Sequence, residues 1–264
     1  MAAMATTRQR AAPGLRLARR AWRIQFTDSK ASLALAERVL ADAAAADVAR
    51  AWARLALAYH RMRYATPAEG LAQFESAQRD FVALADRRGQ ILAVVGTGRC
   101  LWMQGRFDES LALVLPLRDE GLRVLPRDER VLLLNALAGC YSALGQPALA
   151  VGYMYQGLRE GRGERGLGFD AVLHCNLAHE LLLLGDVDEA LRHVDEGLRR
   201  SATLRNPRLD SVLRINRIVA LTDLGRPADA MPDVRELLAT AADAAGRGAS
   251  DAGFETMAIA ALRA

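Results

Sequence analysis

Four glycines at a constant spacing of 40 residues constrain this chain more than any other feature. Each glycine follows an apolar stretch, and an Asp or Pro stands within the next few residues; the four are Gly105, Gly145, Gly185 and Gly225. A glycine at the end of an apolar helix supplies the left-handed conformation that terminates it, and a following Asp or Pro starts the next helix. Recurrence of such a turn at a fixed period is typical of a helical repeat array. The chain is therefore predicted to be all-α, a solenoid of antiparallel helix hairpins.

Small residues recur at two fixed places around each turn. Another 40 residues before Gly105, Ala65 lies in an equivalent turn, so there are five turns and ten such places. Nine of the ten residues at these places are small, which lets the two helices of a hairpin approach closely; seven before each turn they are Ala58, Gly98, Ala138, Ala178 and Ile218, and five after it Gly70, Ser110, Ala150, Ala190 and Ala230. This pattern resembles the tetratricopeptide repeat (TPR), in its longer-helix variant, because the period is 40 residues and not about 34. The family's Trp position holds other residues, namely Arg54, Val94, Leu134, His174 and Arg214. The resemblance implies a right-handed superhelix of about six hairpins.

The turns divide the chain into expected elements. First helices are expected near 50–64, 90–104, 128–144, 169–184 and 208–224, and second helices near 67–86, 107–123, 147–160, 187–201 and 227–244, after an N-terminal pair within 13–46. We expect three parts: a disordered basic arm (1–12), the repeat array (13–251) and a lone terminal helix (252–264).

The expected terminal helix ends where the next turn would begin. It is apolar on much of its circumference, through Phe254, Met257, Ile259 and Leu262. A cap that closes a repeat array shows a polar outer face. We therefore favour a chain that continues into a C-terminal effector domain, or an end that meets a partner or a second copy; a plain cap is the alternative.

Composition narrows the class of protein. Hydrophobic residues make up 52% of the chain, without a long apolar run, so no membrane span is predicted. Positive charge is almost all arginine, and with the alanine richness this is typical of a GC-rich bacterial genome. The net charge is +4; six arginines precede the first acid, Asp28, and the later arginines alternate with acids. Nucleic acid is therefore not an expected partner, and contact of the basic N-terminal arm with nucleic acid is the alternative. Three cysteines without a signal sequence indicate reduced thiols and a cytoplasmic location.

Residues able to carry chemistry are few. The run 161–166 matches G-x-G-x-x-G, but it follows an expected helix where the dinucleotide motif requires a strand. Cys175 and His179 have i, i+4 spacing beside His174, without a second ligand pair elsewhere. Neither a P-loop nor G-x-S-x-G occurs. We therefore predict no catalytic residues, no cofactor and no metal.

The inner face of the array is the predicted binding site. In the TPR family the first helices line the concave groove, and asparagine two before the small residue grips peptides in some members. The resemblance places these residues in a protein- or peptide-binding groove: Leu55, Met62, Val95, Arg99, Trp102, Met103, Asn135, Asn176, His179 and Asn216. Arg63 falls at an equivalent position. Packing between repeats is the alternative role for these side chains.

The Leu-Gly-Asp turns favour a regulatory role. The chain resembles the N-terminal repeat region of bacterial signalling proteins, particularly diguanylate cyclases that end in a GGDEF domain, although no Gly-Gly-Asp-Glu-Phe run is present. The resemblance implies a non-catalytic scaffold that binds a protein or peptide. The alternatives are the sensing region of a transcription regulator, a free-standing assembly adaptor and, third, an enzyme that uses a groove His or Cys.

Overall fold

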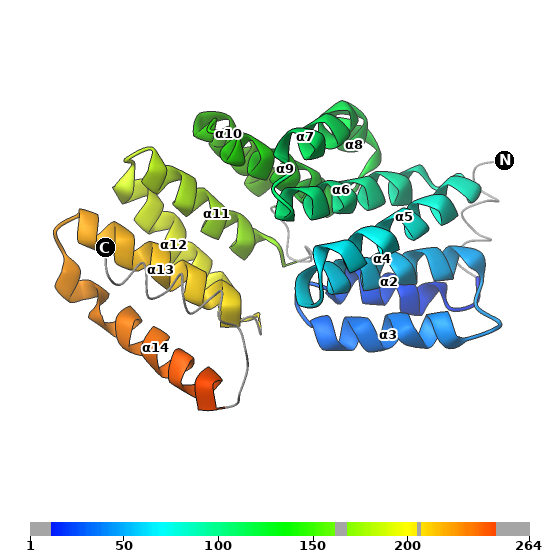
Figure 1. The fold of residues 1–264 in the computed structure, drawn as a ribbon, viewed down its shortest axis with the longest axis horizontal. Helices are drawn as coiled ribbons and strands as arrows, with labels where there is room; N and C mark the ends of the chain where they lie inside the picture. The colour runs from blue at the N-terminus through cyan, green and yellow to red at the C-terminus, as the bar shows by residue number, and fades with distance from the viewer. Residues whose placement is uncertain (1–11, 162–167, 205–206, 247–264) are drawn as a thin grey trace. The chain divides into compact units, whose positions relative to one another are not determined.

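The computed structural model describes residues 12–161, 168–204 and 207–246, and these ranges contain helices and no strand (Figure 1). The chain divides into two compact units, Met1–Phe169 and Asp170–Ala264. The all-α fold of helix hairpins is confirmed within each unit. That residues 13–251 form one array stays a prediction. The expected terminal helix 252–264 and residues 1–11 of the expected arm lie outside the described residues.

The helices pair as the turn spacing predicts. The first unit contains α2 (Leu15–Ile24), α3 (Ser29–Ala41), α4 (Asp47–Tyr64), α5 (Pro67–Ala83), α6 (Arg87–Met103), α7 (Phe107–Val114), the 3₁₀ turn η1 (Leu115–Leu117), α8 (Arg118–Val124), α9 (Arg127–Ala143) and α10 (Pro147–Glu160). The second contains α11 (Asp170–Leu183), α12 (Val187–Ser201), α13 (Pro207–Asp223) and α14 (Pro227–Gly246).

The repeated glycines end their helices in the left-handed conformation. Their φ angles are +77°, +70°, +78° and +69° at Gly105, Gly145, Gly185 and Gly225. At Gly145 the N–H donates to the carbonyl of Ser142, and the next N–H, from Gln146, donates to the carbonyl of Tyr141. This pair of bonds satisfies carbonyls that the helix end would leave free.

One element differs from the sequence prediction. The helix expected over 107–123 is broken into α7, η1 and α8. Pro116 lies in the 3₁₀ turn, where its ring removes a backbone donor and crowds the preceding turn. The single-helix prediction was therefore wrong here, and Pro116 is the physical reason.

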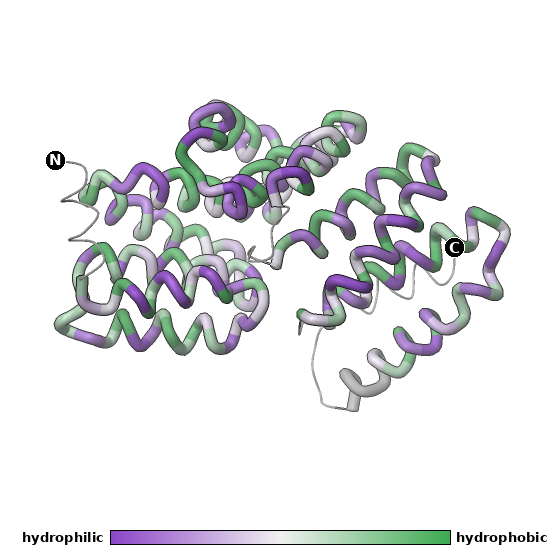
Figure 2. Tube along the Cα trace, turned by 180° about the vertical axis from the view of Figure 1, so that it is seen from behind, coloured by the Kyte–Doolittle hydropathy of each residue, from purple (hydrophilic) through white to green (hydrophobic). Residues whose placement is uncertain are grey.

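The first helices form the buried layer. Ten residues of α9 are buried, but only three of α10 are. Hydrophobic and hydrophilic stretches alternate along the helices (Figure 2). The small positions allow the close approach that the sequence predicts, since a Cβ on Gly98 would lie 2.4 Å from Cγ2 of Val114. The layer made by α4, α6 and α9 is thus the framework on which a site in the first unit is built.

A buried carboxylate joins distant hairpins of the first unit. Glu129 of α9 is 1% exposed. Its Oε1 accepts a hydrogen bond from Nε1 of Trp22 on α2 at 2.5 Å. Both of its oxygens accept from the Arg88 guanidinium of α6 at 2.6 Å. One side chain therefore connects the first, third and fourth hairpins.

The turn glycines predict an opposite response at two neighbouring sites. A Cβ at Gly145 or at Gly152 would meet nothing within 4 Å, but only Gly145 has a positive φ. Gly145→Ala should cost about 1 kcal/mol in the free energy of unfolding through backbone strain. Gly152→Ala, inside α10, should stabilise by about 0.5–1 kcal/mol. Chemical denaturation measures both, and two changes of equal sign would contradict the assignment.

Two adjacent arginines test the buried carboxylate. Arg88→Met leaves Glu129 buried without its counter-charge and should cost about 3–5 kcal/mol in unfolding free energy. Arg87→Met removes an equally bidentate pair with Glu120, whose side chains are 47% and 34% exposed, and should cost less than about 1 kcal/mol. Urea denaturation measures the free energy of unfolding of both variants. Equal losses of unfolding free energy in the two variants would show that Glu129 has no special role.

Candidate functional site

The structure buries half of the predicted groove residues. Leu55, Met62, Val95, Asn135 and Asn216 are at most 6% exposed. At Met62 the cause is visible, because a Cβ on Gly70 of the paired helix would lie 2.8 Å from its Cβ. The prediction that these five side chains line an open groove is therefore corrected: they pack between helices.

Asn216 has a structural bond in place of a free amide. Its Nδ2 donates to the backbone carbonyl of Cys175 at 3.1 Å and thereby joins α13 to α11. A peptide-gripping role would need this amide on an open face. At the equivalent position Asn176 is half-buried, and its binding role stays a prediction.

The remaining predicted residues reach the surface in two places. On α6, Arg99 and Trp102 are half-buried and Met103 is 42% exposed. On α11 of the second unit, His179 is exposed. The structure thus brings Arg99, Trp102 and Met103 together on one helix.

Trp102 holds Arg99 in place. Its Nε1 donates to the carbonyl of Gly139 on α9 at 2.8 Å. The guanidinium carbon of Arg99 lies 4.0 Å from the centre of the Trp102 ring. A guanidinium over an indole face is a cation–π contact, which orients the positive charge without neutralising it.

A second arginine lies at the end of α4. Nη2 of Arg63 donates to the backbone carbonyl of Gln25, just after α2, at 2.8 Å. The guanidinium carbon also lies 4.7 Å from the centre of the Phe26 ring. Tyr59, one helical turn before Arg63, is 4% exposed and packs edge-on against Trp22 and Phe26. We call Gln25, Tyr59, Arg63 and Arg99 the arginine cluster.

Burial dominates the electrostatics of the arginine cluster. Burial raises the pKa of the Tyr59 hydroxyl, and the charges of Arg63 and Arg99 oppose this increase. Burial lowers the pKa of Arg63 to about 10 and also lowers that of Arg99. Among the described residues no carboxylate forms an ion pair with either arginine. The charges of Arg63 and Arg99 therefore act on Tyr59, with an opposing effect from Glu129, and neither arginine has a carboxylate partner among the described residues.

The sequence pointed to only part of this cluster. Arg63 and Arg99 fall at predicted groove positions, whereas Gln25 and Tyr59 were missed. The i, i+4 spacing of Tyr59 and Arg63 was a usable signal, because it places both on one helix face. Gln25 had no signal, since it belongs to another hairpin and meets Arg63 only in the folded chain.

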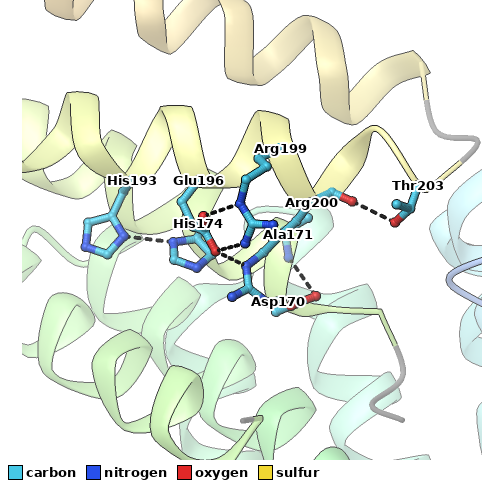
Figure 3. A network of polar contacts seen from close by, with 8 residues as sticks. All are labelled: Asp170, Ala171, His174, His193, Glu196, Arg199, Arg200 and Thr203. Atoms are coloured by element: carbon cyan, nitrogen blue, oxygen red, sulfur yellow. Dashed lines mark hydrogen bonds and ion pairs between the residues drawn. The ribbon is translucent and has the colours of Figure 1, made fainter. Parts of the chain in front are cut away.

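The second unit contains a polar network between α11 and α12 (Figure 3). The Nδ1 atoms of His174 and His193 lie 2.8 Å apart, so the two rings share one hydrogen bond. Glu196 accepts from Arg199 and Arg200, and Arg200 also pairs with Asp170. The network joins the two helices of this hairpin.

The possible metal ligands of α11 do not converge. His174 faces His193 of α12, Cys175 is buried, and His179 is exposed. Burial raises the pKa of the Cys175 thiol to about 12. Within the described ranges, no group of three or more His, Cys, Asp or Glu residues is placed to hold a metal ion. The G-x-G-x-x-G run lies almost wholly outside those ranges.

Comparison with known proteins supports the fold. No family model matches the chain, and no curated protein matches it in sequence. Among solved structures, the Rap protein complexed with Competence and Sporulation Factor matches with TM-score 0.63 and 13% identity, over 89% of this chain and 70% of that one. The APC/C hetero-tetramer Cut9-Hcn1 matches with TM-score 0.62 and 14% identity, over 90% and 47%. Repeats of a Podosopora anserina putative kinesin light chain described as TPR-like match with TM-score 0.52 and 15% identity, over 72% and 93%. The chain has a TPR-like fold.

One further solved structure is similar in fold. Bacillus thuringiensis PlcR, in complex with the peptide PapR7 and DNA, matches with TM-score 0.60 and 13% identity, over 85% of each chain. At such low identity the likeness describes the fold. In this TPR-like chain, no helix of the described residues is long and apolar enough to cross a membrane.

The histidine pair predicts a loss of stability in acid. Burial, with the charges of His193 and Arg200, lowers the pKa of His174 to about 4 from 6.5. The unfolded chain therefore binds the proton more readily, so stability present above pH 6.5 decreases as pH falls toward 4. Between pH 7 and pH 4.5 we expect His174 to account for about 1–2 kcal/mol of this loss, after allowance for solvent screening.

Denaturation of His174→Gln at both pH values measures this contribution. The variant should lose less stability on acidification than the wild type. His179→Gln, at an exposed side chain of the same helix, is the control and should follow the wild type. If all three proteins lose the same stability, the histidine pair does not titrate as described.

Proposed function

We propose that this chain is a non-catalytic scaffold that binds a peptide or protein on the first-helix face of its first unit. The observation that carries the proposal is the group on α6. Arg99 is oriented by Trp102, and the neighbouring Met103 is exposed. Aromatic, Met and Arg side chains are enriched where protein interfaces carry their energy.

Neighbours of the same fold support this proposal. Two of them are complexes with Competence and Sporulation Factor and with the peptide PapR7, and a third is a protein assembly. A repeat stack offers an extended surface for such partners. Because a fold alone does not specify function, the residues on α6 carry the proposal.

The context of the binding event has two candidates. The resemblance of the turns favours the regulatory region of a diguanylate-cyclase-type signalling protein, whose effector domain would follow this chain. The likeness to PlcR, which is bound to both a peptide and DNA, favours the sensing region of a transcription regulator. In both, a partner bound by the repeats controls an output elsewhere, and the buried, unpaired cysteines fit a cytoplasmic location.

Partner capture with two matched variants tests the face. Met103→Glu places a charge on the proposed binding face, at the last residue of α6. Val82→Glu places the same charge near the end of α5, a second helix, at a side chain that is 59% exposed. Partners captured from a bacterial lysate should bind Met103→Glu at least about tenfold more weakly, equivalent to ~1.4 kcal/mol, and Val82→Glu normally.

Equal helicity and equal melting temperature of the two variants are required before the comparison. Identical partners at identical yield on the wild type and on Met103→Glu would remove the first-helix face as the binding site. Loss on Val82→Glu alone would assign binding to the outer helices.

A further inference from the structure

Partly buried arginines in this chain usually have a carboxylate partner. Such pairs are Arg54–Asp80, Arg88–Glu129, Arg130–Glu160, Arg200–Asp170 and Arg214–Asp233. Arg50 instead donates to four backbone carbonyls. Arg63 and Arg99 differ from both kinds, since their polar and ring contacts are a single backbone carbonyl and the faces of aromatic rings. A charge removed from water is costly unless it is paired. The two arginines of the cluster therefore have no negative partner among the described residues.

Further polar atoms of the cluster are buried without a partner. Both amide atoms of the Gln25 side chain, the Tyr59 hydroxyl and Nη1 of Arg63 have no hydrogen-bond partner among the described residues. Gln25 is 1% exposed and Tyr59 is 4% exposed. Buried polar groups in folded proteins are nearly always hydrogen-bonded. Three of these atoms, Nε2 of Gln25, the Tyr59 hydroxyl and Nη1 of Arg63, can donate. Three buried donors beside two arginines without a carboxylate partner indicate a binding site for an anion.

The chemistry of these donors favours a carboxylate. A guanidinium presents a planar fork that matches the two oxygens of a carboxylate, and a phenol and an amide add single donors. Arg63 and Arg99 are each half-buried, so a ligand can reach them. They belong to α4 and α6, and Arg99 lies beside the Trp102 and Met103 of the proposed binding face.

We propose that the arginine cluster binds a carboxylate of a peptide, either its C-terminus or an acidic side chain. This inference rests on the proposed peptide-binding function and specifies what the bound segment carries. Arg63 and Arg99 share the negative charge, while Tyr59 donates to it. The apolar part of the peptide lies toward Met103.

Synthetic peptide pools test the proposal at constant ionic strength. The pools are N-acetylated octapeptides of uncharged residues in four forms: C-terminal acid, C-terminal amide, and the amide with one internal Glu or one internal Gln. Retention on immobilised full-length protein is measured by mass spectrometry. The wild type should retain one of the two acidic forms about tenfold more than its neutral counterpart.

Matched variants distinguish the cluster from general charge. Arg63→Met/Arg99→Met should abolish the preference for acidic pools. Arg61→Met/Arg106→Met removes the same charge from side chains that are 45% and 46% exposed, and should keep the preference. Arg99→Lys keeps the positive charge but removes the planar, two-pronged guanidinium. This variant should weaken the retention of the acidic peptides about tenfold or less. If Arg63→Met/Arg99→Met does not fold, Arg99→Lys is tested in its place.

Each outcome decides the proposal. Preference for the C-terminal acid identifies the terminus as the ligand, and preference for the Glu pool identifies the side chain. Equal retention of acidic and neutral pools, no retention of any pool, or an unchanged preference in Arg63→Met/Arg99→Met would overturn it. Partner capture that depends on Met103 but not on Arg63 and Arg99 would leave the scaffold function standing and reject the carboxylate.

Discussion

The buried carboxylate of Glu129 is the contact on which the first unit depends. In a repeat stack each hairpin normally contacts only its neighbours. Glu129 accepts from Trp22, 107 residues away, and from Arg88, so the first hairpin is attached to the third and fourth. This attachment positions the end of α2, and with it Gln25 and Phe26, against Arg63. The site therefore depends on a contact that is remote from it in sequence.

The repeat fold could be predicted because its signals are local. A glycine with positive φ and a proline within a helix act through their own backbone and do not depend on distant neighbours. Gly145 and its equivalents therefore gave the helix boundaries to within a few residues. Pro116 is an equally local signal for a helix break. The 40-residue period favoured one continuous helix at this place, and the structure has three short segments there instead.

The site could be predicted only in part, because burial and pairing are properties of several helices together. The groove positions predicted on the first helices include both Leu55, which is buried, and Arg99, which is half-buried. The difference arises from what the paired and adjacent helices place over them. Arg88 finds its carboxylate 41 residues away, whereas Arg63 and Arg99 find none among the described residues. Sequence spacing cannot separate these arginines.

The two unpaired arginines are fixed in position without being neutralised. The carbonyl of Gln25 and the ring of Phe26 hold Arg63, and the ring of Trp102 holds Arg99. Such preorganisation lowers the entropy that a ligand loses on binding. At Arg88 the chain itself supplies a carboxylate, whereas at Arg63 and Arg99 none of the described residues does. Sites where local rules of stability fail are where function is expected, and three buried donors without a partner, Nε2 of Gln25, the Tyr59 hydroxyl and Nη1 of Arg63, belong to the arginine cluster.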